Sequence, residues 1–110
     1  MENYPLISIV TVVCNGEKTI EQTINSVLNQ SYPNIEYIII DGDSNDGTMQ
    51  IISKYKDKIA HIVSEKDKGI YDAMNKGISL ASGDIIGLLN SDDYYESDSI
   101  ENIVKHYKPG

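Results

Sequence analysis

Two adjacent carboxylates, Asp92 and Asp93, follow a short apolar run in residues 82–93, which read SGDIIGLLNSDD. Residues 85–89 have the length of a strand and are mostly apolar at consecutive positions, which is typical of a strand buried on both faces of a parallel sheet. Ligands of open α/β sheets bind outside the carboxyl ends of the strands. We therefore expect both acids to lie where a ligand binds.

Two neighbouring carboxylates repel each other, and a divalent cation with oxygen ligands, Mg²⁺ or Mn²⁺, relieves that repulsion. A cation held in this way commonly binds the phosphates of a substrate. The alternative is that the acids solvate a loop and place negative charge before the next helix. For an isolated pair of acids this second interpretation is the commoner one. The choice between a cation site and a solvated loop therefore depends on the residues in the other loops.

Composition restricts the partners of this chain of 110 residues, which has the length of one domain and is 40% hydrophobic. The net charge is -8, from 17 acids and 9 bases, and every base is lysine. Duplex nucleic acid is a poor partner for such a chain. An anionic nucleotide could bind only where backbone N–H groups, lysine or a metal reverse the local field.

The lone cysteine, Cys14, cannot form an internal disulfide, and the first residues lack the pattern of a signal peptide. Cytoplasm is therefore the expected compartment. Apolar runs are far shorter than the ~20 residues that span a bilayer, so any membrane association would come from parts outside this chain.

Strand and helix patterns alternate four times along the chain. The strands are predicted at residues 6–13, 35–40, 59–64 and 85–89, and the first three helices at 17–30, 48–55 and from 70 to Gly83 as the residue after the helix. A last helix follows Ser97, Asp98 and Ser99, with a predicted buried side of Ile100, Ile103, Val104 and Tyr107. This alternation predicts an α/β fold with a parallel sheet, right-handed crossovers and helices on both faces.

The loops after the four strands, at residues 14–17, 41–46, 65–69 and 90–93, should converge at one edge of such a sheet. Acids at two strand ends, joined by a loop with lysine and glycine, are what a nucleotide crevice with a metal would need. The first loop, Cys14-Asn15-Gly16-Glu17, lacks both the glycine-rich dinucleotide motif and the P-loop motif. Both of those site types are excluded.

The segments ISIVTVVCN, IIIDGDSNDGT, KGIYDAMNKGISLASGD and LLNSDD, in this order and spacing, resemble the N-terminal half of the family 2 glycosyltransferases. The resemblance covers nearly the whole chain. It implies a Rossmann-like GT-A type fold, truncated after four β-α units, with residues 1–110 as the nucleotide-sugar-binding part of a glycosyltransferase domain. It also implies a nucleotide-sugar donor, usually a UDP-sugar, with Mg²⁺ or Mn²⁺, and inverting transfer to a glycan, lipid-linked or other hydroxyl acceptor in polysaccharide or cell-envelope glycan synthesis.

Roles for single residues follow from the same resemblance. Asp41 matches the acid that contacts the base, residues 11–17 match the loop around base and ribose, and residues 90–92 match the D-x-D motif. Lys68 could meet the diphosphate or be solvated, and Asn75 matches a family position or fixes its loop by a local hydrogen bond. The expected nucleotide-sugar-binding residues are Thr11, Val13, Asn15, Glu17, Asp41, Lys68, Gly69, Asn75, Asn90, Ser91 and Asp92, and the expected metal ligands are Asp92 and Asp93.

The chain departs from the family pattern at several of these positions. Asn90 replaces the first acid of D-x-D, which predicts weaker metal ligation; Gly42 and Asp43 differ from the usual Asp and Gly, and Met74 replaces a frequent Arg. The general base of the family lies beyond Gly110, so no catalytic residue is expected here and the chain should have little or no transferase activity alone. Its exposed sheet edge would favour self-association.

Three alternatives remain to be weighed. A nucleotidyltransferase would need a glycine-rich, basic first loop, and a phosphatase with an aspartate nucleophile would need acids after the first strand; the chain has neither. A non-catalytic nucleotide-binding or assembly module remains open, because the acceptor side and the general base are not in this sequence.

Overall fold

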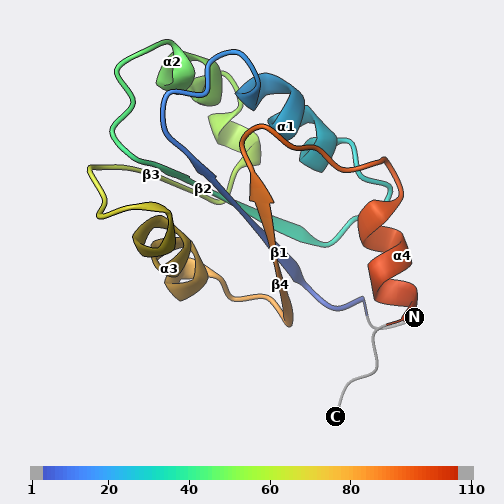
Figure 1. The fold of residues 1–110 in the computed structure, drawn as a ribbon. Helices are drawn as coiled ribbons and strands as arrows, with labels where there is room; N and C mark the ends of the chain where they lie inside the picture. The colour runs from blue at the N-terminus through green and yellow to red at the C-terminus, as the bar shows by residue number, and fades with distance from the viewer. Residues whose placement is uncertain (1–3, 107–110) are drawn as a thin grey trace.

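Residues 4–106 are described by a computed structural model, in which helices cover both faces of one four-stranded sheet (Figure 1). The strands are β1 (Ile7–Val13), β2 (Ile35–Asp41), β3 (His61–Ser64) and β4 (Ile85–Asn90). Their order is β3-β2-β1-β4, and every neighbouring pair is parallel. The predicted α/β fold of four β-α units is confirmed.

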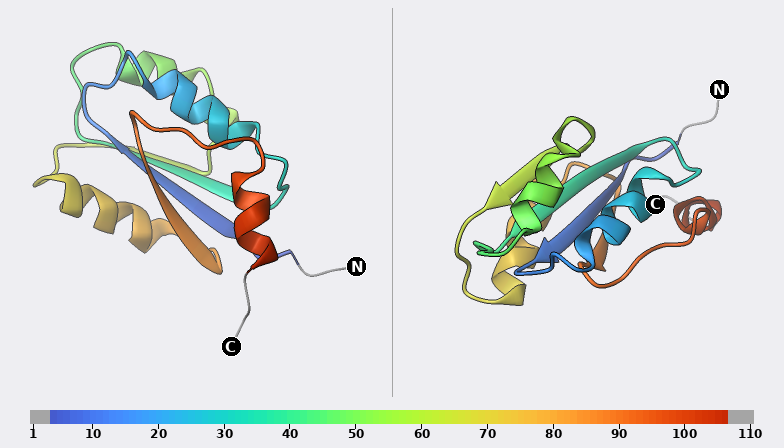
Figure 2. Two further views of the ribbon diagram at one scale, coloured as in Figure 1. Left: turned by 45° about the vertical axis from the view of Figure 1, so that its right-hand side comes forward. Right: turned by 90° about the horizontal axis from the view of Figure 1, so that it is seen from above.

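The helices divide unequally between the two faces. They are α1 (Ile20–Leu28), α2 (Thr48–Ser53), the 3₁₀ turn η1 (Lys56–Lys58), α3 (Ile70–Leu80) and α4 (Ser99–Lys105). Figure 2 shows α1, α2 and α4 on one face and α3 on the other. The chain steps from β1 to β2 to β3 in one direction and returns across the sheet to β4. Right-handed crossovers of opposite direction place their helices on opposite faces, which accounts for the position of α3.

Each face of the sheet has its own apolar core, because successive side chains of a strand point to opposite sides. On the α1 side Ile9 and Ile39 pack with helix residues such as Ile24. On the α3 side Val10 and Ile38 belong to a second, smaller cluster. The β-branched residues that predicted the strands therefore also form both cores.

Several predicted boundaries were wrong by a few residues. Helix α1 begins at Ile20, because residues 17–19 form a turn, and β3 begins at His61. Helix α3 ends at Leu80 with Ala81 in an extended conformation, so Gly83 does not follow the helix end. A Cβ at Gly83 would lie 2.8 Å from the backbone oxygen of Leu6, so glycine is required there for close backbone packing.

The prediction that the last strand is buried on both faces was also wrong. Ile86 and Leu88 of β4 are 41% and 46% exposed, on the face that carries α3. The cause is that β4 lies at the edge of the sheet, whereas α3 packs on β1 and β2. Self-association through this edge stays a prediction.

Helix α4 buries less of its predicted apolar side than expected. Ile100 is fully buried and Val104 packs against the core, but Ile103 is exposed; Tyr107 lies outside the described residues. Within residues 4–106, no helix combines the length and apolar character needed to cross a membrane.

Candidate functional site

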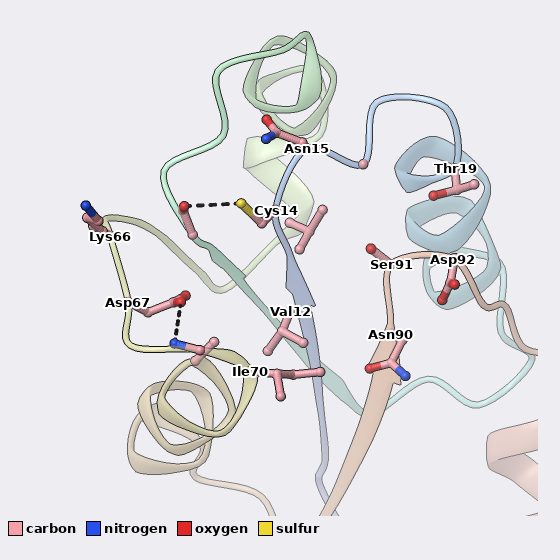
Figure 3. A pocket seen from close by; sticks show the side chains of 15 residues that line it. Val12, Cys14, Asn15, Thr19, Lys66, Asp67, Ile70, Asn90, Ser91 and Asp92 are labelled. Carbon is pink, nitrogen blue, oxygen red and sulfur yellow. Dashed lines mark hydrogen bonds between the residues drawn. The ribbon is translucent and has the colours of Figure 1, made fainter.

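A cavity of about 750 Å³ opens at the carboxyl ends of β1 and β4 (Figure 3). These neighbouring strands mark the place where the direction of the crossovers reverses, which is where open α/β sheets bind ligands. All four strand-end loops contribute to its walls, as predicted. The lining residues are Val12, Val13, Cys14, Asn15, Gly16, Thr19, Gly42, Lys66, Asp67, Gly69, Ile70, Ala73, Asn90, Ser91 and Asp92.

One wall is the turn that follows β4. Asn90, Ser91 and Asp92 all line the cavity, and the turn is closed by a hydrogen bond from the Asp93 N–H to the Asn90 carbonyl, 3.0 Å. Asp93 is not part of the lining, and its Oδ1 accepts from the Tyr94 N–H at 2.9 Å. The structure thus separates the two carboxylates that the sequence presents as a pair.

The opposite wall is the loop before α3 and the first turn of that helix. Gly69 precedes the helix with a φ of +114°, a conformation that favours glycine, and its N–H donates to Asp67 Oδ1 at 3.2 Å. Both lysines of this loop are exposed, and Lys66 lines the cavity whereas the predicted Lys68 does not. The helix N-terminus and Lys66 on this wall favour an anionic ligand, whereas the Asp67 carboxylate beside them disfavours one.

A third wall is the loop after β1, which is cross-linked to the loop after β2. The Asn15 N–H donates to Ser44 Oγ at 2.7 Å, and the Asn45 N–H donates to Asn15 Oδ1 at 2.9 Å. The Gly16 N–H donates to Thr48 Oγ1 at 2.9 Å. Asn15 has a positive φ of 55°, and these reciprocal bonds hold it in that conformation.

Glu17 belongs to the same cross-link and does not line the cavity. Its N–H donates to Asp46 Oδ2, and its Oε1 accepts from the Gly47 N–H, both at 3.3 Å. Hydrogen bonds from Thr48 to Asp46 hold the pKa of that carboxyl below its usual value. The Glu17 side chain therefore supports the neighbouring loop.

Asp41, at the end of β2, is fully buried. Its carboxylate accepts from the Ser44 N–H at 3.0 Å, from Ser44 Oγ at 2.5 Å and from Ser64 Oγ at 2.8 Å. Its neighbour Gly42, and not Asp41, lines the cavity. The carboxylate holds the β2–α2 loop in place, and its contact with a nucleotide base stays a prediction.

Two further predicted residues lie away from the cavity. Thr11 is buried on the α1 side of the sheet, where its hydroxyl is 2.8 Å from that of Tyr37. Burial raises the pKa of Tyr37. Asn75 is exposed on α3. Of the predicted site residues, the structure brings together at the cavity Val13, Asn15, Gly69, Asn90, Ser91 and Asp92.

Sequence reasoning missed lining residues of two kinds. Val12, Cys14 and Gly16 lie within residues 11–17, which were predicted as a segment, and Gly42, Lys66 and Asp67 lie within the loops expected to converge; the sequence does not show which residues of these segments line the cavity. The others, Thr19, Ile70 and Ala73, lie inside or next to helices. Only the position of α3 and α1 around the sheet brings them to the cavity.

The carboxylates of the cavity fit a cation that is shared with a substrate. Within residues 4–106, no three His, Cys, Asp or Glu side chains are grouped so as to hold a metal ion. Asp92 is the one carboxylate of the β4 turn in the lining, beside the Asn90 amide. Mg²⁺ usually takes one or two carboxylates and completes its shell with substrate phosphates and water. The donor set matches this arrangement and not a closed structural metal site.

Solved structures place the fold in the GT-A type of glycosyltransferases. The structure superposes on the crystal structure of S. aureus TarS 1–349 with a TM-score of 0.83 and 28% sequence identity. The superposition covers 91% of this chain and 31% of that chain. The mannosyltransferase PcManGT from Pyrobaculum calidifontis shares the fold, with a TM-score of 0.85 and 24% identity over 94% of this chain and 32% of that one. The fold and its likeness to these glycosyltransferases thus define a glycosyltransferase-like α/β domain.

Residues 8–110 match the model of glycosyl transferase family 2, and the chain belongs to that family. It is 42% identical over 98 residues to the UDP-Glc:alpha-D-GlcNAc-diphosphoundecaprenol beta-1,3-glucosyltransferase WfaP of Escherichia coli, covering 88% of this chain and 39% of that protein. It is 35% identical over 105 residues to the chondroitin synthase of Pasteurella multocida, covering 94% of this chain and 11% of that protein. The chain spans about 40% of the length of the first curated relatives that it matches.

Proposed function

We propose that the chain is the donor-binding part of a glycosyltransferase domain and binds a UDP-sugar in the cavity between β1 and β4. This proposal rests on one observation: the Asn90–Asp92 turn and the wall with Lys66 at the N-terminus of α3 line the same cavity. Similar proteins support the choice of ligand: TarS was solved in complex with UDP-GlcNAc, and glucosyl-3-phosphoglycerate synthase of M. tuberculosis with Mn²⁺ and UDP.

Charge explains how such a site would serve sugar transfer. When the bond between sugar and phosphate breaks, negative charge grows on the nucleotide diphosphate, and groups that stabilise that charge lower the barrier. The chain carries a net charge of -8, so this stabilisation has to be local. Lys66 and the positive end of the α3 dipole, on one wall of the cavity, would provide it. A divalent cation, Mg²⁺ or Mn²⁺, bound through Asp92 would supply further positive charge at the diphosphate.

The acceptor side of the reaction is proposed to lie outside the 110 residues of this chain. The proposal includes inverting transfer, with a general base outside this chain, to a hydroxyl of a glycan or lipid-linked acceptor in the cytoplasm. Relatives named as a chondroitin synthase and as a glucosyltransferase acting on a diphosphoundecaprenol-linked sugar support this acceptor class.

Calorimetric titration with UDP, with and without MnCl₂, tests the proposal. We expect Mn²⁺ to increase the affinity for UDP, and Asp92→Asn to remove most of that increase. Asp57→Asn on η1 removes the same charge outside the lining and serves as the matched control. Asp93→Asn should have the smaller effect of the two adjacent acids, because only Asp92 lines the cavity. Absence of UDP binding by the wild type, or equal Mn²⁺ dependence in wild type and Asp92→Asn, would refute the assignment.

A further inference from the structure

The acidic turn after β4 rests on a buried threonine of α1. Thr23 is 1% exposed, and its Oγ1 lies 2.8 Å from the Ser91 carbonyl oxygen and 2.5 Å from the Asp93 carbonyl oxygen. These two carbonyls flank Asp92 in the chain. The Thr23 hydroxyl therefore contacts the backbone on both sides of the one acid of the turn that lines the cavity.

Thr23 is the first of three polar residues on α1 and just after it that contact the chain following β4. Ser26 Oγ accepts from the Tyr95 N–H at 3.1 Å. Gln30 donates from Nε2 to the Glu96 carbonyl at 2.6 Å and accepts from the Ile100 N–H at 3.0 Å. Thr23 and Ser26 lie one turn apart on α1, and Gln30 lies two residues after its end, so α1 and the residues just after it bind the segment from residue 91 to residue 100. Of the three, only Thr23 reaches the acidic turn.

A threonine within a helix commonly donates to the carbonyl four residues earlier, which would give Thr23 a purely local role. Here that bond, to the Thr19 carbonyl, is 3.4 Å long and is the longest of the contacts of the hydroxyl. The shorter contacts are to Ser91 and Asp93, which follow Thr23 by 68 and 70 positions in the sequence. The geometry is that of a tertiary anchor.

We propose that Thr23 is a positioning residue for the cation and diphosphate site. Its single hydroxyl hydrogen, shared between the carbonyls of residues 91 and 93, fixes the backbone of Asp92 and so directs that carboxylate into the cavity. The identity of the bound group rests on the proposed function, but the anchoring of the turn does not. Because β4 is an edge strand, the turn after it gains support chiefly from the β1 and α1 side.

Two substitutions of Thr23 separate positioning from packing. Thr23→Val keeps the shape of the side chain and removes the hydroxyl, whereas Thr23→Ser keeps the hydroxyl. Tyr37→Phe is the matched control, since it removes a different buried hydroxyl bonded to Thr11 and not to the turn. The Kd of UDP is measured with Mn²⁺ and with EDTA at low temperature, where circular dichroism shows each variant folded.

Outer-shell partners of metal ligands typically contribute about 10–100-fold to metal affinity. We expect Thr23→Val to reduce the Mn²⁺-dependent gain in UDP affinity by about tenfold, within that range, and to leave binding in EDTA unchanged. Thr23→Ser should restore most of the gain, and Tyr37→Phe should keep it despite a lower melting temperature. A folded Thr23→Val protein with the full gain, or a Thr23→Ser protein as impaired as Thr23→Val, would overturn the proposal.

Amide spectra of the ligand-free chain give a second readout that does not depend on the ligand. Thr23→Val is expected to shift or broaden the backbone amide resonances of Asp92 and Asp93, and Tyr37→Phe is expected to leave them in place. Unchanged Asp92 and Asp93 resonances in Thr23→Val would overturn the positioning role. If the wild type fails to bind UDP while these resonances respond as expected, the proposed function fails and the anchoring role of Thr23 stands.

Discussion

Replacing Gly77 by alanine measures how closely α3 must approach the sheet to form its wall of the cavity. A Cβ at Gly77 would lie 2.3 Å from Cγ1 and 3.1 Å from Cγ2 of Val10, which is itself buried in β1. A β-branched side chain packed between strand neighbours has few alternative rotamers, so α3 or β1 would have to move. The helix would then tilt away from the strand whose end lines the cavity.

Two opposing effects set the size of the change. Alanine is favoured over glycine inside a helix by about 1 kcal/mol. Overpacking a filled core costs about 1–3 kcal/mol, and an approach of 2.3 Å belongs in the upper part of that range. The free energy of unfolding of Gly77→Ala should therefore fall by about 1–2 kcal/mol in spite of the better helix former.

Urea unfolding followed by far-ultraviolet circular dichroism gives this free energy, with Ser79→Ala as the control. Ser79 is an exposed position of the same helix, so its replacement by alanine changes helix propensity without adding atoms to the core. We expect Ser79→Ala to be neutral or stabilising by a few tenths of a kcal/mol. A Gly77→Ala protein as stable as the wild type would show that α3 does not depend on close contact with Val10.

Four further predictions concern the buried backbone contact, the buried hydroxyl pair, the pKa of Tyr37 and the loop carboxylate. Gly83→Ala should destabilise the chain by about 1–3 kcal/mol in urea unfolding, because its Cβ would meet backbone atoms 2.8 Å away that cannot rotate aside; a neutral effect would contradict the close packing. Tyr37→Phe should cost about 1–3 kcal/mol by leaving the Thr11 hydroxyl buried without a partner, and the double variant with Thr11→Val should recover part of the loss; additive effects in this cycle would argue against the bond. Burial raises the pKa of Tyr37, so the folded state loses stability as pH rises above about 10, the ordinary tyrosine pKa, and Tyr37→Phe should show a smaller loss in melting temperature over that range. Hydrogen bonds from Thr48 lower the pKa of Asp46, so its contribution is present above its ordinary pKa and lost as pH falls below it; Asp46→Asn should flatten this part of the acid profile, and an unchanged profile would contradict a stabilising role of these hydrogen bonds.

Local pattern in the sequence was enough to predict the fold, since each strand and helix was identified from nearby residues. The β-branched run of β1 and the apolar spacing of α1 are examples, and both are satisfied within one element and its core. The predicted start of α1 was wrong because its first residues are bonded to a neighbouring loop. Residues 17–19 have helical composition, but Glu17 is held by the loop after β2, so the helix starts three residues later than predicted.

The site could be predicted only at the level of loops. The strand-end segments were identified from their composition, and residues 90–92 were found to line the cavity as expected. The choice of Lys66 over Lys68 could not be made from the sequence. The two lysines stand in the same charged loop, and only the course of the backbone into Gly69 determines which of them lines the cavity.

The sequence by itself determined the alternation of strands and helices, the polar loops at the strand ends and the family to which the chain belongs. The tertiary structure decided the strand order, the exposure of β4, the burial of the Asp41 carboxylate and the contact of Thr23 with the turn that carries Asp92. The physical reason is the range of the interactions. Side-chain periodicity acts over a few residues, whereas the groups around the cavity meet through contacts between residues that are 20 to 70 positions apart.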